Sequence, residues 1–215
     1  KSLPRASDDQ FELPPRDRAE WKIDRQGGTA TLDPPVAGIE NFVLPLEPMI
    51  GCFGVAPAMG QAFSTATSAE NGGNMDYRGF GPGATVWFPV AVNGALFFLG
   101  DCHATQGDGE IVGTGIETSY EVEVRLTLEK GKKLIWPRGE NAEDIFSVGN
   151  ARPLDQALQH ATTEMLDWLM ADFGLDEVAA SHVMGQAARY DVANVFNPAY
   201  SVACRVARKA LEGLR

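Results

Sequence analysis

The sequence predicts an α+β fold in which a β-rich body of barrel- or sandwich-like sheets carries two consecutive helices near residues 154–189. Short segments of β-branched and aromatic residues, each bounded by glycine or proline, follow one another from Thr29 onward. After Pro153 the apolar residues recur at helical spacing. Strand-like segments return near the C-terminal end, so the helices are expected to form an insertion before the last strands.

Composition and charge exclude several classes of protein. The chain has 215 residues, of which 44% are hydrophobic and 22% charged, and this is typical of a soluble globular protein. A formal net charge of −11 argues against nucleic acid or an anionic membrane as the main partner. The three cysteines are widely spaced and form no CxxC motif, which favours a reducing cytoplasm over a disulfide framework.

The N-terminal residues differ from the rest of the chain. The segment "LPPRDRAEWKID" contains two adjacent prolines and has no apolar periodicity. We therefore expect an extended arm over residues 1–26 and a single β-rich domain over residues 27–215.

The strands are expected in two groups separated by a loop. The first group is "TATL", "GIENFVLPL" and "MIGCFGVAP", and residues 60–83 then form a long polar loop of a kind that is often functional. The second group is "ATVWFPVAV", "GALFFLGDC", "EIVGTGIE" and "SYEVEVRLTLEK", with a hairpin turn predicted at Asn93–Gly94. Alternation is clearest in the last segment, where one face carries Tyr120, Val122, Val124, Leu126 and Leu128.

The helical segment and the last strands have recognisable boundaries. A helix is predicted from Leu154 to Phe173, where Gly174 would end it. A second helix is predicted to begin near Asp176. The segment "DVANVFNPAYSVACRVARKAL" then predicts two strands joined by a turn at Asn197–Pro198.

The stretch "GDCHATQGDGE", from Gly100 to Glu110, concentrates chemically active side chains. Asp101 and His103 stand two residues apart at a strand end, so a regular strand would present both on one face. Such a pair suits a zinc ion, a hydrogen-bonded catalytic dyad or an ordinary surface ion pair. Glu110 follows two glycines and is either a general base beside a metal site or a turn residue that caps a strand.

A second polar stretch, "NGGNMDYRG", adds weaker candidates. The carboxamide of Asn74 could bind an amide, and the carboxylate of Asp76 could complete a metal site, although such stretches are commonly simple turns. His160 and His182 lie inside the predicted helices and are interpreted as structural.

These segments resemble the acetamidase/formamidase family of metal-dependent amidases. The resemblance covers roughly Leu44 to Arg205 and includes "MIGCFGVAPA", "GGNMDYR", the block from "GATVWFPV" to "GTGIE", "IWPR" and "NVFNP". It implies hydrolysis of a short aliphatic amide, such as formamide or acetamide, to carboxylate and ammonia. It also implies zinc, sometimes with a second divalent metal such as calcium.

The resemblance also assigns roles to residues. Asp101, His103 and Asp76 would be metal-site residues, and Glu110 would be the acid/base. Asn74 and Gln106 would be substrate-binding or supporting groups. Two alternatives remain: a γ-lactamase that acts on a cyclic amide, and a non-catalytic binding or assembly protein that retains the fold.

The chain departs from the family in one respect. Family members usually carry a further β-rich segment before the part seen here, together with some of the metal-site residues. We therefore expect an N-terminal fragment of the same protein as a partner that completes the sheet and the metal site. A homo-oligomer is also expected.

Overall fold

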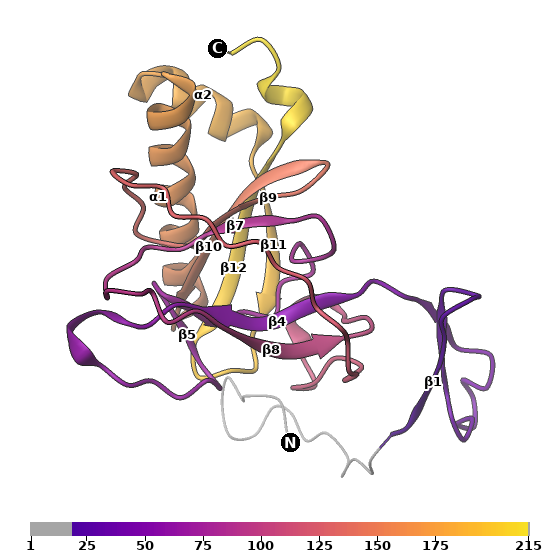
Figure 1. Cartoon of the computed structure of the whole chain (residues 1–215). Coiled ribbons are helices and arrows are strands. Elements are labelled where there is room, and N and C mark those ends of the chain that lie inside the picture. The colour runs from indigo at the N-terminus through magenta and orange to yellow at the C-terminus, as the bar shows by residue number, and fades with distance from the viewer. Residues whose placement is uncertain (1–18, 215) are drawn as a thin grey trace.

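The computed structural model describes residues 19–214, which form three antiparallel sheets and two helices (Figure 1). The first sheet has the order β1-β2-β3, the second β5-β6-β4-β8 and the third β11-β12-β10-β9-β7. The strands are β1 (Trp21–Asp24), β2 (Thr29–Leu32), β3 (Val43–Pro45), β4 (Met49–Gly54), β5 (Ser68–Ala69), β6 (Gly72–Asn74), β7 (Thr85–Trp87), β8 (Phe98–His103), β9 (Arg138–Glu140), β10 (Asp144–Ala151), β11 (Arg189–Asn194) and β12 (Tyr200–Ala207). The helices are α1 (Leu154–Phe173) and α2 (Glu177–Ala187).

The five-stranded sheet is the central layer. Its longest pairing joins β10 to β12, from Asp144 opposite Ala207 to Ala151 opposite Tyr200. Helix α1 covers one face, where Met165 and Leu169 pack with Ile145 and Val206. Gly149 allows this close packing, because a Cβ atom there would lie 2.1 Å from the carbonyl oxygen of Ala157.

The opposite face of the central sheet packs against the four-stranded sheet. Phe146 and Val148 alternate with Ile145 along β10, so they point away from α1 and toward Phe53 and Tyr77. The rings of Tyr77 and Phe146 meet edge to face with centroids 5.1 Å apart. The described part of the molecule is therefore layered as helix, sheet and sheet, so the predicted α+β class is confirmed and the sheets form sandwich-like layers rather than a closed barrel.

The predicted helices and final strands are also confirmed. Helix α1 ends at Gly174, whose φ of 68° is the left-handed conformation that glycine adopts readily. Helix α2 begins after Asp176, whose Oδ1 accepts a hydrogen bond of 2.8 Å from the backbone N–H of Ala179. Strands β11 and β12 follow.

Two strands predicted from the sequence are wrong. Residues 110–117 and 119–130 form no strand in the described part of the chain, apart from one isolated bridge between His103 and Glu117. The alternation of apolar and polar residues shows which side chains could share one face of a strand, but a strand also needs a neighbouring segment with which its backbone forms hydrogen bonds. No backbone hydrogen bond joins residues 119–129 to another described segment.

Turn and loop predictions need smaller corrections. A turn does form at Asn93–Gly94, where the N–H of Ala95 donates to the carbonyl of Val92, but it joins no hairpin. Strand β7 pairs with β9, whereas β8 pairs with β4. The loop predicted over residues 60–83 contains the short strands β5 and β6, and β9 and β10 were not predicted at all.

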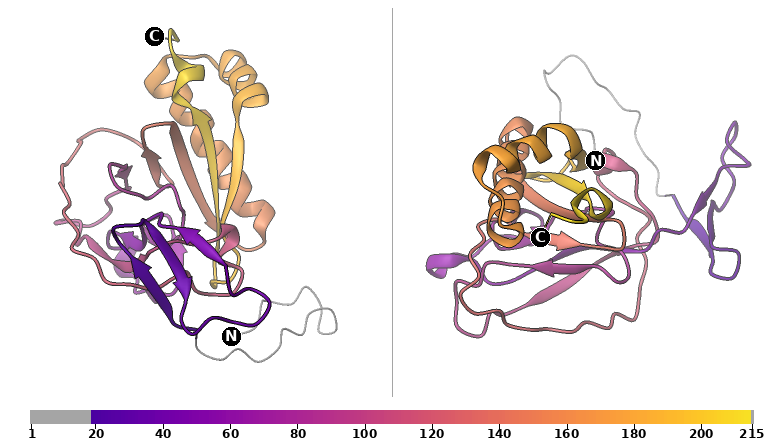
Figure 2. Two further views of the ribbon diagram at one scale, coloured as in Figure 1. Left: turned by 90° about the vertical axis from the view of Figure 1, so that its right-hand side faces the viewer. Right: turned by 90° about the horizontal axis from the view of Figure 1, so that it is seen from above.

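The N-terminal region is only partly described. Residues 1–18 of the predicted arm lie outside the described residues, and the domain boundaries stay a prediction. Within the arm, Trp21–Asp24 pairs with Thr29–Leu32, and the resulting three-stranded sheet projects from the body (Figure 2). None of the described helices is long and apolar enough to cross a membrane.

A buried ion pair links α1 to the segment "IWPR". The side chains of Arg138 and Glu164 are each 2% exposed, and the Nε of Arg138 donates to Glu164. The other carboxylate oxygen of Glu164 accepts from the backbone N–H groups of Ile135 and Trp136, at 3.0 and 3.1 Å. Glu164 thus accepts hydrogen bonds from three donors of this segment, the backbone N–H groups of Ile135 and Trp136 and the side chain of Arg138.

We predict that Glu164→Ala strongly destabilises the protein. Removing the carboxylate leaves the Arg138 charge buried without its partner, which costs about 3–5 kcal/mol. Chemical denaturation would measure the free energy of unfolding. Asp167→Ala is the matched control, because Asp167 is exposed on the same helix and should change that free energy by less than about 0.5 kcal/mol. Equal midpoints for the two variants would contradict the prediction.

Candidate active site

Asp101 and His103 lie together at the end of β8. His103 pairs with Met49 of β4 and is fully buried, whereas the side chain of Asp101 is 30% exposed. The Nε2 atom of His103 lies 3.4 Å from Oδ1 of Asp101. The strand is not regular at this point, because Asp101 has a φ of 62°. The two residues therefore meet through a local distortion.

Asp76 completes a cluster of three potential metal ligands. It follows β6, is fully buried, and has a carboxylate oxygen within 4.8 Å of ligand atoms of both Asp101 and His103. Its Oδ1 is buried and has no hydrogen-bond donor among the described residues, and Nε2 of His103 is buried facing carboxylate oxygens of Asp101 and Glu117. Buried polar atoms are rarely left unpaired, so this group of oxygens around one imidazole nitrogen fits a bound cation.

A glycine on β4 makes room for these carboxylates. A Cβ atom at Gly51 would lie 2.3 Å from Oδ1 of Asp76 and 3.0 Å from Oδ2 of Asp101. Such distances are too short for any side chain. The sequence "IGCF" therefore places a glycine at the one point of β4 where both acidic side chains approach the backbone.

Glu110 is held beside Asp76 by an asparagine. The Nδ2 of Asn194 donates to Oε2 of Glu110 and, at 2.9 Å, to Oδ2 of Asp76. Asn197 donates a further hydrogen bond of 2.8 Å to the same oxygen of Asp76. Glu110 is 7% exposed and Asn194 is fully buried. The two asparagines thus set the positions of the two carboxylates.

Gln106 fixes the orientation of the His103 ring. Its Nε2 donates to the carbonyl of Asp76 at 2.6 Å, so its Oε1 faces Nδ1 of His103 at 2.8 Å. An oxygen acceptor at that distance requires a proton on Nδ1, both in the neutral ring and in the charged ring. Nε2 is therefore the ring atom that points toward the carboxylates, and in the neutral ring its lone pair could bind a metal. Gln106 consequently supports His103.

Negative charge accumulates in this buried space. Burial raises the pKa of Asp76 to about 6, and burial together with the charge of Asp76 raises the pKa of Glu110 to about 8. The contact with His103 lowers the pKa of Asp101. Burial alone would lower the pKa of His103, but the carboxylates of Asp101 and Glu117 outweigh it and raise that pKa to about 11. The site therefore favours a positive charge at Nε2.

The sequence did not identify Glu117, Asn194 or Asn197 as site residues. Oε1 of Glu117 lies 3.1 Å from Nε2 of His103, although half of the glutamate side chain is exposed. The only sequence signals were the segments "GTGIE" and "NVFNP", which carry no metal-ligand spacing. Asn74 is connected to the cluster through its backbone rather than its side chain. Its carbonyl oxygen accepts a hydrogen bond of 3.1 Å from Nδ2 of Asn197.

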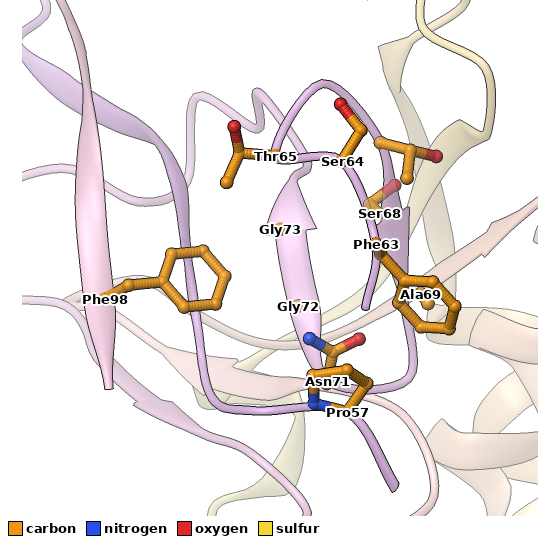
Figure 3. Close-up of a pocket in the computed structure, with 11 residues that line it drawn as sticks. Pro57, Phe63, Ser64, Thr65, Ser68, Ala69, Asn71, Gly72, Gly73 and Phe98 are labelled. Carbon is orange, nitrogen blue, oxygen red and sulfur yellow. The ribbon is translucent and has the colours of Figure 1, made fainter. Parts of the chain in front are cut away.

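A small pocket lies close to this part of the sheet. It has a volume of about 40 Å³ and is lined by Phe63, Asn71 and Phe98 among others (Figure 3). None of its lining residues is acidic or belongs to the cluster. The pocket thus offers neither a carboxylate nor an imidazole.

Comparisons with known proteins point to one family. The model of the acetamidase/formamidase family matches residues 49–160, which is more than half of the chain. An acetamidase from Mycolicibacterium smegmatis is 38% identical over 91 residues, which make up 42% of this chain and 22% of that protein. A formamidase from Methylophilus methylotrophus is 35% identical over 74 residues, or 34% of this chain and 18% of that protein.

Solved structures agree with this assignment. The crystal structure of an acetamidase from Yersinia enterocolitica has a TM-score of 0.77 and 34% identity, with 89% of this chain and 55% of that chain covered. For the crystal structure of an acetamidase from Bacillus halodurans the TM-score is 0.80 and the identity 31%, and the match covers 90% of this chain and 63% of that chain. The chain thus spans less than two thirds of the length of these relatives. It belongs to the acetamidase/formamidase family.

Proposed function

We propose that the protein hydrolyses the C–N bond of a short aliphatic amide and yields a carboxylate and ammonia. The observation that carries this proposal is the buried Nε2 of His103, which faces the carboxylates of Asp76 and Asp101 while a third carboxylate, that of Glu110, is held beside Asp76. The names of the relatives, acetamidase and formamidase, support a linear amide as the substrate.

Zinc is the proposed cofactor, with Asp76, Asp101 and His103 as its ligands. One imidazole nitrogen and two carboxylate oxygens are a donor set that suits this ion, and the buried Oδ1 of Asp76, which has no described hydrogen-bond donor, fits it. When bound, it would polarise the amide carbonyl and lower the pKa of a water molecule from 15.7 to about 7. A second divalent ion such as calcium stays part of the proposal, because Glu110 and Glu117 offer further oxygen ligands.

Glu110 is the proposed acid/base. Its carboxylate would accept a proton from the attacking water as the water oxygen bonds to the carbonyl carbon. The same proton would then pass to the nitrogen as the C–N bond breaks, so that ammonia leaves. Asn194 keeps the carboxylate in place by donating to Oε2, and Asn74 is the proposed contact for the amide group of the substrate.

We predict that Glu110→Gln removes nearly all activity. The amide of glutamine cannot accept the water proton, so kcat/KM for acetamide and formamide should fall by about 10²–10⁴-fold. Ammonia release measures the activity, and zinc content should stay at the parental level. Asp108→Asn is the matched control, since Asp108 lies in the same turn with an exposed side chain and should change the rate less than about two-fold.

Two outcomes would argue against this assignment. If Glu110→Gln retains activity within a few-fold of the parent, another group is the base. If the zinc-loaded parent releases no ammonia from either amide, the chain is better described as a binding or assembly protein that retains the family fold.

We further predict that His103→Ala lowers the bound zinc. The variant loses the imidazole ligand, and metal content by elemental analysis should fall well below that of the parent. His182→Ala is the control, because His182 is exposed on α2, away from the cluster. Equal zinc content in all three proteins would limit His103 to a structural function.

A further inference from the structure

The turn between β11 and β12 holds the loop that carries Glu110. Asn194 is the last residue of β11, and its Nδ2 donates a hydrogen bond to Oε2 of Glu110, 84 residues away in the sequence. The next residue, Val195, donates its backbone N–H to the carbonyl oxygen of Gly109 at 2.8 Å. A side chain and a backbone group of one turn therefore fix both Glu110 and the residue before it.

The side-chain amide of Asn194 has only one possible orientation. Its Oδ1 accepts hydrogen bonds from the backbone N–H groups of Phe196 and Asn197, at 2.9 and 2.8 Å. Its Nδ2 must then face the acidic side chains, and it donates to Oε2 of Glu110 and to Oδ2 of Asp76. The fold, and not a ligand, therefore sets the direction of both N–H bonds of this amide.

The two oxygens of the Asp76 carboxylate differ as a result. Oδ2 accepts one hydrogen bond of 2.9 Å from Asn194 and a second, of 2.8 Å, from Asn197. Oδ1 is buried and has no hydrogen-bond donor among the described residues. Glu110 shows the same division, because Asn194 donates to its Oε2 and no donor of the described residues reaches its Oε1. One oxygen of each carboxylate is thus held, and the other is left to act.

The oxygen of Asp76 that is left lies beside a second acidic side chain of the cluster. A Cβ atom at Gly51 would lie no more than 3.0 Å from Oδ1 of Asp76 and from Oδ2 of Asp101. These two oxygens therefore approach the same point of β4, while Oδ2 of Asp76 faces the asparagines. The hydrogen bonds to Oδ2 thus turn Oδ1 toward the atoms that could bind a cation.

We propose, on the basis of the function proposed above, that Asn194 is a positioning residue that gives the two acids different tasks. It holds Oδ2 of Asp76, which leaves Oδ1 as the oxygen that can bind zinc. It also holds Oε2 of Glu110, which leaves Oε1 as the oxygen that accepts the proton of the attacking water. Asn197 shares only the first contact, since its Nδ2 donates to Asp76 and to the carbonyl of Asn74.

Comparing the two asparagines tests this proposal, because they share one contact and differ in the other. Zinc affinity is measured by competition with a chelator, and kcat and KM for acetamide by ammonia release at saturating zinc. Asn194→Ala and Asn197→Ala should both raise the Kd for zinc about ten-fold or more, since each removes a hydrogen bond to Oδ2 of Asp76. Asn93→Ala is the matched control, because Asn93 is an exposed asparagine of another turn and should keep the parental affinity and rate.

The rate at saturating zinc separates the two variants. The kcat of Asn194→Ala should fall about 10²-fold with little change in KM, because Glu110 loses the group that positions it. The kcat of Asn197→Ala should fall less than about ten-fold, because Glu110 keeps its donor. If circular dichroism shows that Asn194→Ala is unfolded, Asn194→Asp provides the same test of kcat. Its carboxylate can still accept from the two N–H groups of the turn but offers no N–H to Glu110.

The outcomes distinguish this proposal from the proposed function. A parent that releases no ammonia removes the proposed function and the positioning role with it. An active parent whose two asparagine variants lose the same factor in kcat removes the positioning role alone. Parental zinc affinity in both variants would also overturn the proposal, because the hydrogen bonds to Oδ2 would then have no effect on the zinc-binding oxygen.

Discussion

The arrangement of this molecule depends on burying several carboxylates around one histidine. Asp76 and Glu110 lie in the interior, where an ionised carboxylate is costly unless it is paired. Asn194 donates one hydrogen bond to each of them, and Gln106 orients the imidazole between them and Asp101. Potential ligand atoms of Asp76, Asp101 and His103 lie within 4.8 Å of one another, so negative charge is concentrated at one point beside the imidazole.

The backbone is distorted where each acidic residue enters the cluster. Asp76, Asp101 and Glu110 have φ values of 47°, 62° and 44°, and the described residues contain only three other non-glycine residues with positive φ. This conformation is unfavourable for residues with a Cβ atom and is typical of functional sites that the surrounding structure holds in place. The three acids come from separate loops and a strand end, so each requires its own support from the sheets.

That support comes from the aromatic core between the two larger sheets. Tyr77, next to Asp76, packs against Phe146 and donates a hydrogen bond of 3.0 Å to Asp191 on β11. Asp191 is also paired with Arg205 of β12 at 2.9 Å. Asn194 lies on the same strand as Asp191, so this contact connects the strand that carries the asparagine to the residue next to Asp76. The core, the central sheet and the site are therefore one connected structure.

The sequence by itself determined the elements whose signals are local. Apolar residues at helical spacing predicted both helices, with Gly174 at the end of the first and Asp176 at the start of the second. The block from Gly100 to Glu110 identified His103 together with Asp101 and Glu110. Only the tertiary structure decided which strands pair. The alternation of apolar and charged residues in 119–129 is that of a strand, yet these residues form none, because the pattern does not depend on whether a neighbouring strand is present. The tertiary structure alone also brought Asn194 and Asn197 to Asp76, across more than a hundred residues. A hydrogen bond between side chains so distant in sequence leaves no periodic or spacing signal, since it exists only once the sheets have packed.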